Sequence, residues 1–227
     1  MKIRIAPSIL SADFSRIADA VRTAEAAGAD LIHIDIMDGH FVPNLTLGPQ
    51  IVAALKKQTS LPLDVHLMVE NPRSFIPLFH DAGADWISIH LEASRHLHKD
   101  VTSIRELGAK AGLALNPATP LHLMREIIGE LDFVLLLTVN PGWGGQKFIP
   151  SCMMKIRRLK DWIREEKLAA AVEIDGGVNL ANFEDLIRAG ADIFVAGSSI
   201  FRADDPAAVI RRMKAVAAGC GRKGRGG

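Results

Sequence analysis

Ala27-Gly28-Ala29-Asp30 leads directly into the apolar run Leu31-Ile32-His33-Ile34-Asp35-Ile36-Met37, and this succession of a glycine turn and a strand indicates the fold class. Related tetrapeptides recur as Ala82-Gly83-Ala84-Asp85, Leu107-Gly108-Ala109-Lys110 and Ala189-Gly190-Ala191-Asp192. Glycine is favoured just past the last turn of a helix, because the left-handed conformation needed there is open to it. Successive glycines lie 55, 25 and 82 residues apart. These spacings are about two, one and three times a unit of about 27 residues, the size of one strand plus one helix.

Eight short apolar runs accompany this period, at residues 3–9, 31–37, 63–69, 86–91, 111–116, 133–139, 171–175 and 193–197. Helix starts are predicted at Asn71-Pro72, Thr119-Pro120 and Asp205-Pro206, where a capping side chain precedes proline. Eight βα units in 227 residues leave little room for a second domain. The prediction is a (β/α)8 TIM barrel of parallel strands with outer helices over residues 1–218, followed by a flexible, basic, glycine-rich tail at 219–227.

The bulk composition excludes several classes of partner. With 27 basic and 26 acidic residues, the chain has no overall field for nucleic acid or an anionic membrane. No apolar run is long enough to span a bilayer. The two cysteines are far apart and the N-terminus lacks a signal-peptide pattern, so a cytoplasmic protein is expected.

Polar side chains interrupt three of the predicted strands near their C-terminal ends, where barrels carry their chemistry. Alternation sends His33, Asp35 and Met37 to one face of the second strand, and His66 and Met68 to one face of the third. Asp175 ends the seventh strand. Two imidazoles and two carboxylates are therefore expected to converge on one divalent metal ion, Zn, Fe(II), Mn or Co.

The alternative for each residue is an isolated, hydrogen-bonded barrel side chain. Burial of His33 and Asp35 on one inward face without a partner would be costly, and this favours the metal site. The other six histidines are assigned no role; among them, His90 comes closest, because its strand end also faces the mouth. Met37 and Met68 are expected in the core or as a dry lining beside the metal.

Glycine-rich loops follow the last three strands: Asn140-Pro141-Gly142-Trp143-Gly144-Gly145-Gln146, Gly176-Gly177 and Gly197-Ser198-Ser199. Loops of this kind let backbone N–H groups approach an anion, and barrels commonly hold phosphate at the last two strands. No dinucleotide or P-loop motif is present.

Five ordered motifs together resemble the ribulose-phosphate 3-epimerase family: HIDIMDGHFVPNLTLGP from His33, DVHLMV from Asp64, NPGWGGQKF from Asn140, EIDGGVN from Glu173 and VAGSSIF from Val195. The resemblance runs from Ile5 to about Phe201. It implies epimerisation of a phosphorylated ketose, D-ribulose 5-phosphate to D-xylulose 5-phosphate in the pentose phosphate pathway, at C3 through a 2,3-enediolate. It also implies a homo-oligomer.

The resemblance also implies residue roles. Asp35 and Asp175 would be the catalytic acid/base pair, and both would bind the metal together with His33 and His66. The substrate-binding residues would be Ser8, His66, Gly142, Trp143, Gly144, Gly145, Asp175, Gly176, Gly177, Gly197 and Ser198. Two positions depart from the family pattern: Leu137 stands where relatives often have a third methionine, and Trp143 replaces the usual phenylalanine.

Three alternatives remain open on the sequence. The same motifs would serve a hexulose 6-phosphate such as allulose 6-phosphate. A decarboxylase or lyase would need a lysine near the carboxylates of the second or third strand, and none lies between His33 and Gly48. A non-catalytic sugar-phosphate binding protein would not need both carboxylates and both histidines.

Overall fold

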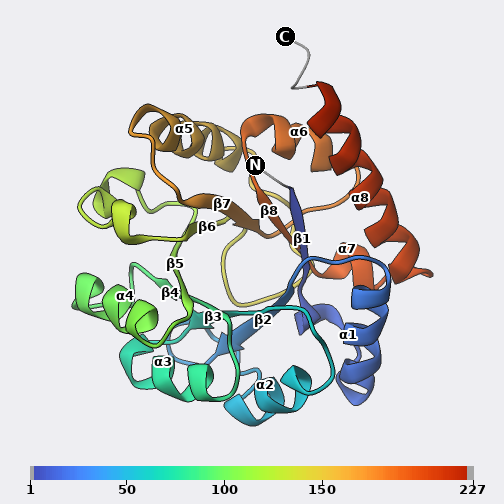
Figure 1. The fold of residues 1–227 in the computed structure, drawn as a ribbon, viewed down its shortest axis with the longest axis horizontal. Coiled ribbons are helices and arrows are strands. Elements are labelled where there is room, and N and C mark those ends of the chain that lie inside the picture. The colour runs from blue at the N-terminus through green and yellow to red at the C-terminus, as the bar shows by residue number, and fades with distance from the viewer. Residues whose placement is uncertain (1–2, 224–227) are drawn as a thin grey trace.

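The computed structural model describes residues 3–223, and these form a barrel of eight parallel strands. The strands are β1 (Arg4–Pro7), β2 (Ile32–Met37), β3 (Leu63–Met68), β4 (Trp86–His90), β5 (Lys110–Leu115), β6 (Phe133–Leu137), β7 (Ala171–Asp175) and β8 (Ile193–Ala196). From β2 to β8 each strand pairs with the next along the chain, and β8 pairs with β1. A parallel bridge between Ser8 and His33 joins the ends of β1 and β2. The predicted (β/α)8 barrel is confirmed (Figure 1).

The helices lie outside the ring of strands (Figure 1). They are α1 (Ile17–Ala26), α2 (Pro49–Lys56), α3 (Pro72–Asp81), α4 (Leu97–Glu106), α5 (Cys152–Glu165), α6 (Phe183–Ala189), α7 (Ser198–Phe201) and α8 (Pro206–Lys223), with short 3-10 helices η1 (Ile9–Ser11), η2 (Phe14–Arg16), η3 (Leu121–Met124) and η4 (Ile128–Glu130). The four glycines of the repeat all have positive φ, as a residue just past a helix requires. No helix among residues 3–223 is long and apolar enough to cross a membrane.

The predicted helix starts have different outcomes. At Asp205 the side chain accepts a hydrogen bond from the Ala208 N–H, which caps α8. α3 does begin at Pro72, but Asn71 makes no side-chain bond to the helix backbone. The helix predicted after Thr119 is wrong: η3 and η4 take its place, and the Thr119 hydroxyl bonds to Glu92 instead of capping a helix.

The three aspartates of the repeat, and Asp132 just before β6, have a structural role that the sequence analysis did not assign. Each follows a helix and accepts a hydrogen bond from a backbone N–H at the start of a neighbouring strand. The pairs are Asp30 with Ile5, Asp85 with Leu63, Asp132 with Ala111 and Asp192 with Val172, at 2.8 to 2.9 Å. These bonds satisfy donors at the N-terminal end of the barrel, opposite the mouth.

Apolar side chains fill the N-terminal half of the barrel interior, including Leu31, Trp86, Phe133 and Ile193. A larger apolar cluster packs between the strands and the helices. The polar inward-facing residues lie further along the strands, so the C-terminal half of the interior is free for a polar site.

The C-terminal helix is longer than predicted. α8 continues to Lys223, past the tail boundary expected at residue 219. The flanking alanines are strong helix formers, and each glycine costs a helix only about 1 kcal/mol. Residues 224–227 of the predicted tail lie outside the described residues.

Candidate active site

The four predicted metal ligands meet at the C-terminal mouth of the barrel. Asp35 on β2 lies beside His66 on β3 in the strand register, and β7 ends at Asp175. One possible ligand atom from each of these residues and from His33 lies within 4.8 Å of the others. Three strands therefore supply two nitrogen and two oxygen donors to one point, a set that suits a divalent transition metal.

The contacts within this cluster suit a bound cation. His33 Nε2 is buried without a hydrogen-bond partner among the described residues and lies 3.4 Å from Asp35 Oδ1. The same carboxylate oxygen lies 3.3 Å from His66 Nδ1. Two ring nitrogens thus face one carboxylate oxygen, and an ion bound between them would satisfy all three atoms.

The two carboxylates of the cluster differ in proton affinity. Burial, together with the negative charge of Asp35, raises the pKa of Asp175 to about 7. Burial also acts to raise the pKa of Asp35, but the neighbouring His33, above all through its charge, and His66 outweigh it and hold this pKa well below its usual range. The Ser8 hydroxyl donates to Asp35 Oδ2 at 2.6 Å. Two nearby carboxyl groups with separated pKa values suit the roles of acid and base.

A second group of acidic side chains lies directly behind His33. Asp64 Oδ2 is 2.6 Å from His33 Nδ1, and both residues are fully buried. Glu173 is also fully buried, and burial and the charge of Asp64 raise its pKa well above the ordinary value. The sequence analysis missed both residues as parts of the site. Strand alternation could have identified them, because Asp64 shares the inward face with His66, and Glu173 with Asp175.

His90, which the sequence analysis left without a role, is in contact with the predicted ligands. It is fully buried, and its Nε2 lies 2.9 Å from Nε2 of His66. Its Nδ1 lies 3.1 Å from Oε2 of Glu92. Burial acts to raise the pKa of Glu92, but hydrogen bonds from His90, Thr119 and the Asn116 backbone lower it to about 2.

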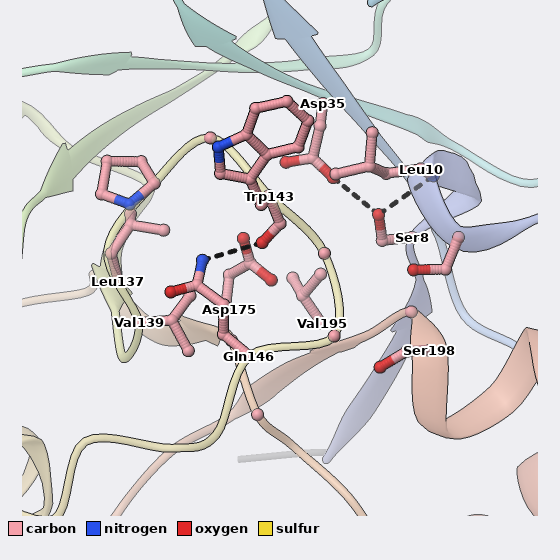
Figure 2. A pocket seen from close by; sticks show the side chains of 18 of the residues that line it. Ser8, Leu10, Asp35, Leu137, Val139, Trp143, Gln146, Asp175, Val195 and Ser198 are labelled. Atoms are coloured by element: carbon pink, nitrogen blue, oxygen red, sulfur yellow. Dashed lines mark hydrogen bonds between the residues drawn. The ribbon is translucent and has the colours of Figure 1, made fainter. Parts of the chain in front are cut away.

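A pocket opens above the cluster. The loop after β6 crosses the mouth of the barrel (Figure 1). Figure 2 shows Asp35 and Asp175 directed into this pocket, with Trp143 on the loop. The predicted residues that line it are Ser8, Asp35, Met37, Met68, Gly142, Trp143, Gly144, Gly145, Asp175, Gly176, Gly177, Gly197 and Ser198. Leu137 lies in the lining beside Asp175, so the wall has two methionines and a leucine. The Trp143 side chain is largely exposed.

Gly177 and Gly197 let two of the loops come close to neighbouring backbone. Gly177 has φ +69°, and a Cβ on it would lie 2.3 Å from the Phe148 backbone nitrogen. A Cβ on Gly197 would lie 2.9 Å from Ser11 Oγ. Larger residues at these positions would force the loops apart, so the glycines allow the close approach of loops that line the pocket.

Together, the fold and the site define a class: a (β/α)8 barrel enzyme with clustered metal-ligating side chains beside glycine-rich loops. The sequence profile of the ribulose-phosphate 3 epimerase family matches residues 4–201. The chain belongs to this family.

Individual relatives agree with this assignment. The chain is 50% identical over 213 residues to "Ribulose-phosphate 3-epimerase" of Bacillus subtilis, covering 93% of this chain and 98% of that protein. It is 47% identical over 211 residues to "Ribulose-phosphate 3-epimerase" of Escherichia coli K12, with 92% and 94% covered.

Solved structures with low sequence identity share the fold. KGPDC from Streptococcus mutans superposes with a TM-score of 0.73 at 14% identity, covering 96% of this chain and 98% of that one. 3-Hexulose-6-phosphate synthase from Salmonella typhimurium gives 0.70 at 17% identity, with 96% and 99% covered. Such identities establish the architecture alone. Among the described residues no lysine lines the pocket, which disfavours the lyase alternative.

Proposed function

We propose that this enzyme interconverts D-ribulose 5-phosphate and D-xylulose 5-phosphate by removing and returning the proton at C3. The observation that carries the proposal is the pair Asp35 and Asp175, which enter one pocket with widely separated pKa values. Near neutral pH Asp35 is ionised, whereas Asp175, with a pKa of about 7, can hold or release a proton. Membership of the family supports the same reaction.

The proton transfers balance within the substrate and the two carboxyl groups. An ionised carboxylate removes the C3 proton, and the electron pair moves toward the C2 carbonyl to give an enediolate. The other carboxyl group then delivers its proton to the opposite face of C3, which inverts that carbon. In the reverse direction the two residues exchange roles, so no oxidant or reductant is needed.

His33, Asp35, His66 and Asp175 would hold one divalent metal ion, and their donor atoms suit Zn, Fe(II), Mn or Co. A bound ion supplies electrostatic stabilisation of the negative charge that develops on the substrate oxygens. Ser8 holds Asp35 in position through its 2.6 Å hydrogen bond. Part of the pocket wall is apolar and consists of Met37, Met68 and Leu137. This wall limits the access of water to the intermediate.

The phosphate would bind between the glycine-rich loops. Gly142, Trp143, Gly144 and Gly145 follow β6, Gly176 and Gly177 follow β7, and Gly197 and Ser198 follow β8. These residues lie on the side of the pocket supplied by the last three strands, where phosphate commonly binds in this fold. His66 would contact the sugar only from the metal side, because it is fully buried. The homo-oligomer and the cytoplasmic location stay predictions.

The test is epimerisation of ribulose 5-phosphate in heavy water, with allulose 6-phosphate as the competing substrate. We expect solvent deuterium at C3 in both directions and the higher kcat/KM for the pentulose. Asp35→Asn and Asp175→Asn should each lower kcat by at least about 100-fold, the usual contribution of acid/base catalysis.

The matched control is Asp161→Asn, which alters an exposed carboxylate on α5 and should keep full activity. The metal content of each variant is measured by elemental analysis, because both aspartates are also proposed ligands. A metal-replete Asp175→Asn enzyme with a near wild-type rate would rule out the two-carboxylate mechanism. Higher efficiency on allulose 6-phosphate would reassign the substrate.

A further inference from the structure

A chain of side-chain contacts leads outward from the proposed metal site through His90 to Glu92. His66 Nε2 lies 2.9 Å from His90 Nε2, and His90 Nδ1 lies 3.1 Å from Glu92 Oε2. Both imidazoles are fully buried, so no water competes for these nitrogens. Each ring nitrogen along the chain therefore has one partner, and its role as donor or acceptor follows from that partner.

At the Glu92 end of this series of contacts, the direction of the hydrogen bonds is fixed. The other oxygen of Glu92 accepts the backbone N–H of Asn116 at 2.8 Å and the hydroxyl of Thr119. Glu92 is partly exposed and its carboxyl group receives these two donors, so it is an ionised carboxylate that can only accept. His90 Nδ1 must therefore carry the hydrogen, which leaves His90 Nε2 as an acceptor.

The acceptor role of His90 Nε2 determines which ring nitrogen of His66 carries the hydrogen. Only one hydrogen fits between two ring nitrogens 2.9 Å apart, and since His90 Nε2 accepts, His66 Nε2 donates. A neutral His66 then has an unprotonated Nδ1. That atom faces Asp35 Oδ1 at 3.3 Å, which is longer than the 2.7 to 2.9 Å typical of a charged N–H···O pair. Two facing acceptors at this distance suit a cation between them.

We propose that Glu92 is a positioning residue that acts through His90 to hold His66 in the tautomer with a free Nδ1 for the metal. The inference rests on the proposed metal site. It gives His66 the counterpart of the arrangement at His33, where Asp64 lies 2.6 Å from Nδ1 and leaves Nε2 for the ion. Here, however, the carboxylate acts across a second imidazole.

The decisive variant is Glu92→Gln. The backbone N–H of Asn116 is fixed in place and can only donate, so it should bond to the side-chain carbonyl oxygen of the glutamine. The amide NH2 would then point toward His90 Nδ1. His90 would then protonate on Nε2, and His66 would be forced to protonate on Nδ1. We expect the affinity for Zn2+, measured on the full chain against a chromophoric chelator, to fall about 10- to 100-fold, as for other outer partners of ligating histidines.

Two further variants separate this role from simple packing. Glu130→Gln changes an exposed carboxylate paired with Arg105 and should leave the Zn2+ affinity unchanged. His90→Phe keeps a ring beside Phe41 but removes the link. In the His90→Phe background, Glu92→Gln should cause no further loss of Zn2+ affinity. A further loss equal to that in the wild type would overturn the proposal.

The tautomer is read directly in metal-free protein by two-bond 1H–15N correlation of the histidine rings. Wild-type His66 should carry its hydrogen on Nε2, and the Glu92→Gln protein on Nδ1. A hydrogen on Nδ1 of wild-type His66 would overturn the proposal even if the variants failed to fold. If wild-type protein bound no Zn2+ but had the expected tautomer, the proposed metal site would fail while the tautomer relay stood.

Discussion

At the scale of single residues, the pocket depends on positions where a side chain cannot be accommodated. Gly177→Ala adds a Cβ 2.3 Å from the Phe148 backbone nitrogen at a φ of +69°. We expect the displaced loop to weaken phosphate binding, with the loss of a charged hydrogen bond worth about 1.5 to 3 kcal/mol and so a KM about 10- to 100-fold higher. Steady-state kinetics on ribulose 5-phosphate measure this effect.

The control for that substitution is Gly129→Ala, on η4, where an added Cβ meets nothing within 4 Å and φ is not positive. Its KM should match the wild type. An unchanged KM in folded Gly177→Ala protein would contradict a phosphate site at the loop after β7.

At the scale of elements, the aspartates of the repeat join helices to strands with different degrees of burial. Asp192 pairs with Lys160 at 2.6 Å, and both side chains are at most 10% exposed. Asp85 makes the same kind of pair with Lys56, but there both are 38% exposed. Asp192→Asn leaves a buried ammonium without its counter-charge and should lower the free energy of unfolding by about 3 to 5 kcal/mol. Asp85→Asn should cost about 1 kcal/mol or less.

Urea unfolding of the two variants measures this difference directly. Both should retain the kcat of the wild type while folded, because these pairs lie at the end of the barrel opposite the mouth. Equal losses of stability in the two variants would show that burial does not control the contribution of these pairs.

At the scale of the whole molecule, the proposed ion would link β2, β3 and β7, strands from both halves of the chain. An ion that binds the folded state alone, at about 100 times its Kd, adds about 2.7 kcal/mol, which raises Tm by about 5 to 10 °C for a chain of this size. Thermal unfolding with and without Co2+ measures the shift. Asp175→Asn should remove most of it.

The increase in Tm caused by Co2+ should also depend on pH. The pKa of Asp175 is raised from 3.8 to about 7, so its burial as the protonated acid stabilises the metal-free fold at low pH, and this contribution is lost as the pH rises through 7. The proton also competes with the metal below that pH. The Tm increase with Co2+ should therefore be larger at pH 8 than at pH 6. A smaller increase at pH 8 would contradict the role of Asp175 as a ligand.

The barrel and the position of the polar residues along its strands can be predicted from the sequence alone. The glycine period marks the βα units, and the alternation His33, Asp35 and His66 places these side chains inside because strand geometry has a period of two. Parallel strands then bring their C-terminal ends to one face. These are local rules, so they can be applied without knowing which strands are neighbours.

The contacts around those residues become visible in the three-dimensional structure. The pairing of Asp64 with His33, and of His90 with both His66 and Glu92, depends on the register between adjacent strands and on side-chain distances of about 3 Å. The separation of the Asp35 and Asp175 pKa values likewise arises from burial and from charges that different strands bring together. The hydroxyl of Thr119, which was expected to cap a helix, likewise bonds to Glu92, 27 residues earlier in the chain.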